Sequence, residues 1–431
     1  MIAACVEAAV ASGAPDIAAL QNRAGSLKRQ RRYEDALLAY EAVLALEGGN
    51  LHALNECGGL HVWLGRPAAA VACYDRALAV APRTVVLHIN KGTAQVALNR
   101  FVDALASFEA ALAIDPESAE AHYDASLVRL RLGDFRNGWR EYEWRWRKGG
   151  GQPELAAPLW LGEEPLKNKT ILLLAEQGFG DTINFMRYAP LVAARGATVI
   201  LGVQSQLKAI AAAVPGVALA LGAGEPVPPV DFYCPLLSLP HAFKTELATV
   251  PANIPYVRPD SERLAKWRDR LADNGRMRVG ICWAGSNVHL NDRNRSIPLK
   301  RFATILVPGV DFVSLQRDVG APELAILSAH GVQQIGQEFS DFADAAAVVA
   351  TLDLVISVDT SIAHLAGAMA KAVGVLIPFS PDFRWMLDRT DSPWYPTMRL
   401  FRQSAIGDWD GPLERLREEL TAVGSRPVKP R

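Results

Sequence analysis

Amphipathic stretches return every 34 residues along the first third of the chain. Each stretch has apolar residues at helical spacing, which predicts a pair of helices in every repeat. Four stretches align: RRYEDALLAYEAVLAL, GRPAAAVACYDRALAV, NRFVDALASFEAALAI and GDFRNGWREYEWRW. The alignment has an aromatic column of Tyr40, Tyr74, Phe108 and Tyr142, and small residues at Gly58, Gly92 and Ser126. The small residues let paired helices approach closely, and Pro82 and Pro116 end two of the repeats.

This pattern resembles the tetratricopeptide repeat, with about three full units and a final half unit over residues 17–148. We therefore assign residues 1–150 to an all-α repeat array. Such an array offers a concave surface lined by the first helix of each repeat. One position of that helix carries Asn22, Glu56, Asn90 and Asp124. The column resembles the asparagine rows of protein O-GlcNAc transferases, which implies an acceptor peptide held along it. Exposed polar side chains of no special role are the alternative interpretation.

From Lys169 onward, short apolar runs alternate with helical stretches, a pattern typical of parallel βαβ units. The first series reads TILLLAEQ, TINFMRYAPLVAARG and ATVILGVQ. A second series contains the strand-like runs RVGICWAG, VDFVSLQ, LDLVISV and VGVLIP. Between the two series, the polar helix SERLAKWRDRLADNGR places a boundary within residues 257–277. The predicted fold is thus an α-helical solenoid followed by two Rossmann-like α/β halves, at residues 151–262 and 263–431.

Ligands of parallel sheets bind beyond the carboxyl ends of the strands, so the loops that follow the predicted strands form the candidate site. After ILLLAEQ, Gly178 and Gly180 allow a tight turn with room for a ligand, and Asp181 stands at the start of the next helix. Asp181 is either a functional carboxylate or a simple helix cap. Ile183 occupies the position of the third glycine in a dinucleotide-binding fingerprint, which disfavours a nicotinamide-dependent dehydrogenase.

Two loops of the second half carry candidate ligands for a nucleotide. Ser286 and Arg295 follow GICWAG, and arginine with hydroxyl neighbours suits a diphosphate, although a cationic run is also typical of a solvated loop. Gln316 ends VSLQ and is a candidate for hydrogen bonding to the nucleotide.

A third loop of the second half predicts an anion site more strongly. The strand LDLVISV is followed directly by Asp359, Thr360 and Ser361, where a helix begins. The first N–H groups of that helix and the two hydroxyls are therefore expected to face a phosphate. His364 lies one turn further and can pair with a phosphate or a sugar hydroxyl, or simply pack.

The segments TILLLAEQGFGDTINFMRYAP and LDLVISVDTSIAHLAGA resemble the two signature regions of glycosyltransferase family nine, the ADP-heptose heptosyltransferases, over roughly residues 165–425. That family has the GT-B fold. The resemblance implies that Asp181 deprotonates the acceptor hydroxyl and that Arg295, in place of the family's lysine, stabilises the departing diphosphate. It also implies a donor-binding motif whose members here are Asp359, Thr360, Ser361 and His364, with Ser361 replacing a glycine.

A closer resemblance is to bacterial proteins that join tetratricopeptide repeats to this domain, and whose ending is similar to PDFRWMLDRTDSPWYPTMRLFRQ here. It implies a protein acceptor, which is flagellin in some members. We therefore expect a glycosyltransferase that uses a nucleotide sugar, a protein or peptide acceptor recruited by the array, and no metal ion or cofactor. The alternatives are a non-catalytic scaffold with a degenerate transferase domain, and a transferase that elongates lipopolysaccharide or another glycan.

Further cleft candidates follow the last predicted strand. Arg384 and Arg402 are cationic candidates, and an aromatic cluster there can stack a base or sugar or form core: Phe383, Trp385, Trp394 and Tyr395. Acidic pairs elsewhere do not resemble a metal site, since Asp341 and Asp344 fall in a helical stretch.

Composition narrows the partners. The 431 residues are 50% hydrophobic with a net charge of -1, which indicates a folded chain without the positive excess of a nucleic-acid-binding protein. The five cysteines form no CxxC pair, which predicts reduced thiols. The Ala-rich first twenty residues contain Glu7 and Asp16, which predicts a leading helix instead of a secretory signal. Reduced thiols are typical of the cytoplasm, where we expect the protein. No apolar run is long enough to span a bilayer, so any membrane association is expected to be peripheral.

Overall fold

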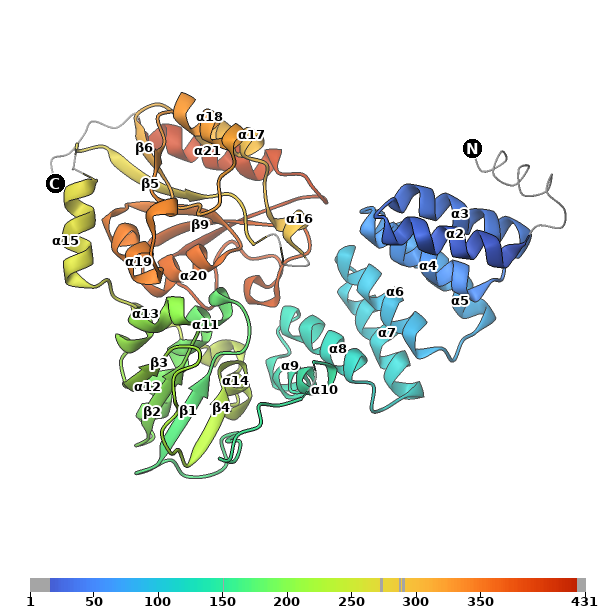
Figure 1. Cartoon of the computed structure of the whole chain (residues 1–431), viewed down its shortest axis with the longest axis horizontal. Coiled ribbons are helices and arrows are strands. Elements are labelled where there is room, and N and C mark those ends of the chain that lie inside the picture. Colours follow the sequence, from blue (N-terminus) through green and yellow to red (C-terminus); the bar gives the residue numbers. More distant parts are fainter. Residues whose placement is uncertain (1–15, 150, 272–273, 287, 289–290, 425–431) are drawn as a thin grey trace. The chain divides into compact units, whose positions relative to one another are not determined.

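The computed structural model describes residues 16–149, 151–271, 274–286, 288 and 291–424. The chain divides into two compact units, Met1–Gln152 and Pro153–Arg431 (Figure 1). The described part of the first unit is helical, and the second unit contains two parallel sheets with their helices, which confirms the predicted fold class. Most of the predicted leading helix falls outside the described residues, and the first described helix begins at Ile17.

Helical pairs follow one another through the first unit. The first helices of the pairs are α2 (Ile17–Arg29), α4 (Leu51–Trp63), α6 (Val85–Ala97) and α8 (Ala119–Arg131). The second helices are α3 (Tyr33–Leu46), α5 (Pro67–Val80), α7 (Phe101–Ile114) and α9 (Phe135–Tyr142), and the short α10 (Arg145–Lys148) follows. Successive first helices contact each other, α4 with α6 and α6 with α8, as expected for a solenoid.

The aromatic column packs against the small residues of the same repeat. Tyr74 and Phe108 are fully buried. A Cβ atom added to Gly92 would lie 2.5 Å from the Phe108 ring, and one added to Gly58 would overlap the ring of Tyr74. The two helices of each of these repeats therefore close on each other only because a glycine faces the ring.

The second unit begins with a four-stranded parallel sheet in the order β3-β2-β1-β4. Its strands are β1 (Thr170–Leu174), β2 (Thr198–Gly202), β3 (Val217–Leu221) and β4 (Phe232–Pro235). Its helices are α11 (Phe179–Phe185), α12 (Ala189–Ala193), α13 (Lys208–Ala212) and α14 (Leu239–Ala242). Leu172, at the centre of β1, pairs with Ile200 and Tyr233 on the two neighbouring strands. The central β1 thus carries the α11 loop at its carboxyl end.

A six-stranded parallel sheet follows in the order β10-β9-β8-β5-β6-β7. Its strands are β5 (Met277–Cys282), β6 (Val310–Ser314), β7 (Gln333–Gln334), β8 (Leu354–Val358), β9 (Ala372–Ile377) and β10 (Met398–Arg402). Figure 1 shows α17 (Leu299–Phe302), α18 (Ala321–Ala329) and α21 (Asp410–Gly424) toward one side of this sheet. On the other side lie α15 (Ser261–Arg270), α19 (Phe342–Thr351) and α20 (Ser361–Ala368).

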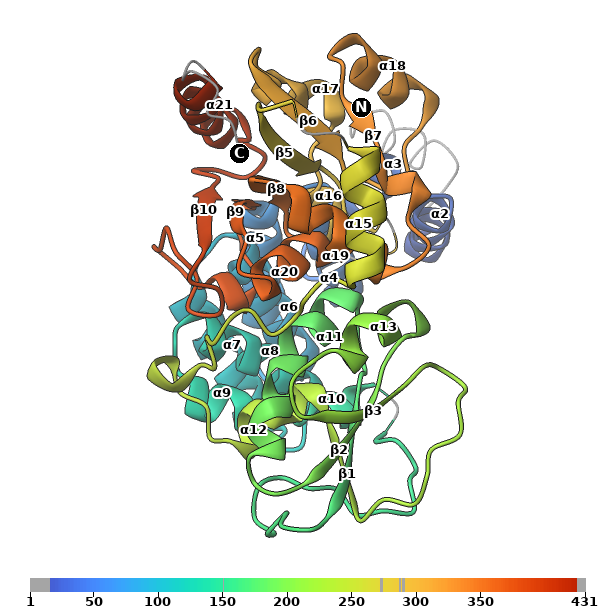
Figure 2. The ribbon, with the colours of Figure 1, turned by 90° about the vertical axis from the view of Figure 1, so that its left-hand side faces the viewer.

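The two sheets of the second unit are joined by their helices. Helix α11 of the first half packs against α20 of the second, and α13 packs against α19 (Figure 2). Because α11 follows β1 and α20 follows β8, two of the predicted loops meet. Among the described residues, no helix combines the length and apolar character needed to cross a bilayer.

Candidate functional site

The start of α11 lies against the first turns of α20. Gly180 is at this contact: a Cβ atom there would lie 2.9 Å from Cδ2 of His364 and 3.7 Å from the Cα atom of Ser361. The sequence suggested that this glycine makes room for a ligand. The structure shows that it makes room for the second half of the same unit.

Asp181 is both a helix cap and a group at the contact between the halves. Its Oδ2 accepts a hydrogen bond from the N–H of Gly178 at 3.0 Å, which is the capping interaction. Its Oδ1 is paired with the guanidinium of Arg384, which belongs to the second half. The Asp181 side chain keeps 23% of its surface exposed, so a ligand can still reach the carboxylate.

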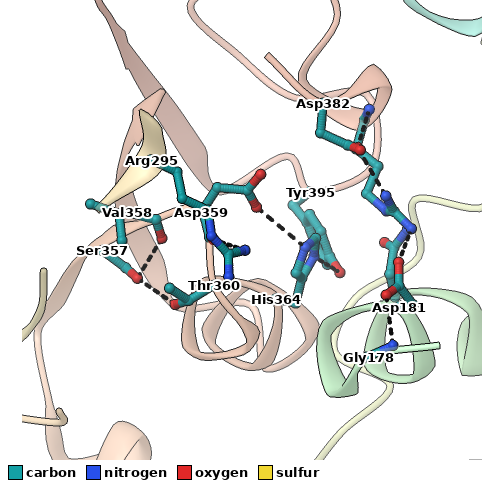
Figure 3. Close-up of polar contacts among 12 residues, drawn as sticks. Gly178, Asp181, Arg295, Ser357, Val358, Asp359, Thr360, His364, Asp382 and Tyr395 are labelled. Atoms are coloured by element: carbon teal, nitrogen blue, oxygen red, sulfur yellow. Dashed lines mark hydrogen bonds and ion pairs between the residues drawn. The ribbon is translucent and has the colours of Figure 1, made fainter. Parts of the chain in front are cut away.

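Asp359 and His364 form the opposite wall of the site (Figure 3). Nε2 of His364 lies 3.8 Å from Oδ1 of Asp359, and Nδ1 lies 3.0 Å from the hydroxyl of Tyr395. Burial, and next the charge of Arg384, hold the pKa of His364 well below its ordinary value, so the ring is neutral. Burial, and next the nearby carboxylate of Asp382, raise the pKa of Asp359 to about 6.

Arg295 reaches the site from the short helix α16 (Asp292–Arg295). Its Nη1 donates to the carbonyl oxygen of Asp359 at 2.9 Å, and Nε lies 3.4 Å from Asp292. A Cβ atom at Gly285 would lie 2.7 Å from the guanidinium carbon, so this glycine leaves the space in which the cation lies. Ser286 is exposed on the same loop. The structure thus places Arg295 next to the Asp359 turn.

Two predicted side chains are already engaged within the second sheet. Oε1 of Gln316 accepts from the N–H of Ala284 at 3.1 Å and from the thiol of Cys282 at 3.4 Å. The Thr360 hydroxyl lies 2.9 Å from that of Ser357, inside the strand end, so it does not face outward as expected. What this turn offers an anion is therefore the backbone of the α20 start, where Ser361 is half-buried.

The aromatic cluster is core. Phe383, Trp385, Trp394 and Tyr395 are all at most 2% exposed. Two of them nevertheless contact a predicted site residue, His364. The ring of Trp385 stacks on the His364 ring with centroids 5.4 Å apart, and the Tyr395 hydroxyl forms a hydrogen bond with Nδ1 of His364. Arg402 donates to the carbonyl oxygens of Arg389 and Met386, and burial lowers its pKa to about 10. It is a structural cation of that loop.

Arg187 is a residue of the site region that sequence reasoning missed. It is buried on α11's side of the unit and donates to the carbonyl oxygens of Pro251 and Trp394 and to the Tyr256 hydroxyl. Its guanidinium also lies 4.3 Å from the centroid of the Tyr395 ring. Nothing in the local sequence marks it, since apart from Asn184 its hydrogen-bond partners lie 64 to 207 residues further along the chain.

A hollow of about 560 Å³ opens beyond the carboxyl end of β6, lined by Arg317, Asp318, Val319, Gly320 and Gln337. Among the described residues, no group of three His, Cys, Asp or Glu side chains could hold a metal ion. Asp341 and Asp344 pair with Arg263. The described cysteines, at positions 57, 73, 234 and 282, are buried and form no disulfide. Cys5 lies outside the described residues.

In the helical array, the predicted polar column is mostly paired within the array. Glu56 binds Lys28 at 2.7 Å, Asn90 donates to Asn55 at 2.8 Å, and Asp124 binds Lys148 at 3.1 Å. Asn22 is exposed. Burial is the largest influence on Asp124 and raises its pKa. A ligand along this column would have to share or displace these partners.

No family model matches the chain. Protein FlbA of Caulobacter vibrioides is 25% identical over 436 residues, which cover 93% of this chain and 72% of that protein. A structure of MamA from Desulfovibrio magneticus is similar over 32% of this chain and 78% of its own, with 18% identity and a TM-score of 0.30. A glycosyl transferase family 9 structure from Veillonella parvula is similar over 60% of this chain and 97% of its own, with 11% identity and a TM-score of 0.46.

Proposed function

We propose that this protein is a glycosyltransferase that moves a sugar from a nucleotide-sugar donor to an acceptor hydroxyl. The observation that carries the proposal is the pairing of Asp181 with Arg384, from the half that also carries the Asp359, His364 and Arg295 cluster, together with the packing of Gly180 against His364. A partly exposed carboxylate thus stands across from cationic and N–H groups, as a base and a leaving-group site must. Both lie beyond strand ends, where ligands of parallel sheets bind.

The chemistry assigns one role to each side of the site. Asp181 takes the proton of the acceptor hydroxyl while that oxygen bonds to the anomeric carbon of the donor sugar. The bond from that carbon to the diphosphate breaks, and its electron pair stays on the phosphate oxygen. Arg295 and the N–H groups at the start of α20 stabilise the negative charge that builds there. Neutral His364 contributes a hydrogen bond.

The remaining predicted residues belong to the donor side. Gly178 and Gly180 let the α11 turn approach both α20 and the donor, and Gln316 and Ser286 border the strand ends beside it. The hollow beside Arg317 and Gly320 is the proposed place for the nucleoside, because it opens at the carboxyl edge of the same sheet. The scheme uses protein cations for the leaving diphosphate and assigns no metal ion or cofactor.

The acceptor is proposed to be a cytoplasmic protein or peptide recruited by the helical array. Solenoid arrays bind partners along the surface of their first helices. The column of Asn22, Glu56, Asn90 and Asp124 supplies hydrogen-bonding groups at a regular spacing there, with Lys28 and Lys148 beside it. An extended peptide repeats its backbone groups regularly and suits such a column.

The first experiment is a thermal-shift screen of the full chain against ADP, UDP, GDP, CMP and their common sugars. A ligand that binds only the native state raises the melting temperature. We expect one nucleotide to raise the melting temperature selectively. In a second assay, the protein should release that nucleotide from the corresponding nucleotide sugar. If no nucleotide shifts the melting temperature at millimolar concentration, and calorimetry agrees, the transferase proposal fails and the scaffold alternative replaces it.

A further inference from the structure

Arg384 is held mainly by its own half of the second unit, with one aromatic contact from α11 of the other half. It lies in the short turn Phe383–Trp385 that follows β9. The carboxylate of Asp382 accepts both from the backbone N–H of Arg384, at 3.0 Å, and from its Nη1, at 2.9 Å. The guanidinium also lies over the rings of Phe383 and Phe185, 4.4 and 5.2 Å from their centroids. With 7% of the side chain exposed, the arginine has little freedom to move.

The carboxylate of Asp181 is held from two directions. Its own helix supplies the N–H of Gly178 to Oδ2, and the opposite half supplies Nη2 of Arg384 to Oδ1. Because the two oxygens have different partners, the plane of the carboxylate is determined. Helix α11 alone would fix only one of the two oxygens.

We propose that Arg384 is the positioning residue of the proposed base, and that it couples the base on the first half to the donor site on the second. This inference rests on the proposed function. Arg384 belongs to the half that carries Arg295, Asp359 and His364, so the side chain that orients Asp181 is built into the donor side. The unshared face of the Asp181 carboxylate is thereby directed to the acceptor oxygen. A displacement of about 1 Å in such a group can cost roughly 100-fold in rate.

Two other roles for the same arginine predict different results. If Arg384 restrained Asp181 in an inactive pair, its removal would speed the reaction. If Arg384 bound the donor diphosphate, its removal would weaken nucleotide binding. A positioning role predicts that kcat falls while the KM for donor and the nucleotide Kd stay close to those of the wild type.

The test compares Arg384→Met and Arg384→Lys with the wild-type full chain. The assay measures release of nucleotide from the donor found by the thermal-shift screen, with water as the acceptor, together with nucleotide affinity by calorimetry. We expect Arg384→Met to lower kcat roughly 10- to 100-fold with nucleotide affinity within about 2-fold, since orientation effects act on the reacting geometry. Arg384→Lys keeps the charge and should recover part of the loss. It carries the test alone if the methionine variant does not fold.

Arg389→Met is the matched control, because Arg389 lies in the same loop and pairs with Asp391 at 2.7 Å, outside the site. Its kcat should equal that of the wild type. An Arg384→Met variant with unchanged or raised kcat overturns the positioning role, and so does a loss of nucleotide affinity that accounts for the loss of rate. A wild type that releases no nucleotide from any donor overturns the proposed function, and this role with it.

Discussion

Glycines serve the two units of this protein in different ways. In the helical array, Gly58 and Gly92 each face an aromatic ring that lies 16 residues further along the chain, in the next helix. In the second unit, Gly180 faces His364, which lies 184 residues away and in the other half. The same residue type therefore closes a local helix pair in one unit and assembles a long-range site in the other. We therefore expect substitutions at the array glycines to change the stability of the array, and substitutions at the long-range contacts of the second unit to change the rate of the proposed reaction.

The largest effect should come from the site. Replacing Asp181 by Asn removes the proposed base but keeps an oxygen that can accept from the N–H of Gly178. We expect the rate of transfer to fall about 100- to 10,000-fold, as for loss of a general base, with nucleotide affinity nearly unchanged. Nucleotide release and calorimetry measure the two quantities. Loss of the folded state would instead show that Asp181 serves mainly as a cap, and the contrast between the units would break.

Gly92→Val tests the array by its effect on the melting temperature, where Asp181→Asn tests the site by its effect on rate. The valine side chain would overlap the ring of Phe108, so the helix pair has to open, at a cost of roughly 1–3 kcal/mol or more. We expect a lower melting temperature for the array without a change in nucleotide affinity. Gly59→Ala is the control, because a Cβ atom there meets only the Tyr74 hydroxyl, at 4.0 Å. Gly65→Val is less suitable: it has nothing within 4 Å, but the backbone of Gly65 has a positive φ, which strains any other residue. Weaker nucleotide binding in Gly92→Val would contradict the separation of roles.

Arg295→Ala tests whether the cation beside the Asp359 turn holds the diphosphate. A charge-assisted hydrogen bond contributes about 1.5–3 kcal/mol, so the nucleotide Kd should rise roughly 10- to 100-fold. The helical array should keep its melting behaviour. Arg301→Ala, which breaks an exposed pair with Asp410 on the same half, provides the comparison. An unchanged Kd would remove Arg295 from the donor site.

The smallest effect is expected from Asp359, through pH. Its pKa is raised to about 6 in the folded protein, so between about pH 4 and pH 6 the folded state binds more protons than the unfolded state. Stability contributed by this group is therefore present below pH 4 and lost as the pH rises through 6. Arg295, Arg384 and the carboxylate of Asp382 are the charges that face it. Asp359→Asn should flatten this part of the stability curve and raise the free energy of unfolding at pH 7 by about 1–3 kcal/mol, measured by urea denaturation. A lower free energy of unfolding at pH 7 in Asp359→Asn would show that the carboxylate is stabilised when ionised.

The sequence predicts the array better than the site, for a physical reason. A 34-residue period repeats each local contact, so the roles of Tyr74 and Phe108 can be inferred from alignment alone. Six strands of the second unit were also identified, because each is a continuous apolar run. The strands β3, β4, β7 and β10 were not, since they are short or border the sheet edges and carry weaker patterns.

The site residues were found one loop at a time, and their mutual contacts were not. Motif positions located Asp181 and His364, but nothing in the sequence pairs Asp181 with Arg384 across 203 residues. The inward turn of the Thr360 hydroxyl depends on Ser357, a buried polar residue that an apolar strand pattern gives no reason to notice. The buried Arg187 was missed for the same reason: its partners are mostly carbonyl oxygens, which every residue has.

The separation of 203 residues between Asp181 and Arg384 also determines when this pair can form during synthesis of the chain. At about 5–20 residues per second, a ribosome needs roughly 10 to 40 s to reach the arginine after it has made the aspartate. During that interval the repeats can already fold, since each repeat packs against repeats next to it in the sequence, which are already synthesised. Asp181 cannot form its pair with Arg384 until the ribosome has added that arginine. The pairing of Asp181 with Arg384 is thus among the last contacts this chain can form during its own synthesis.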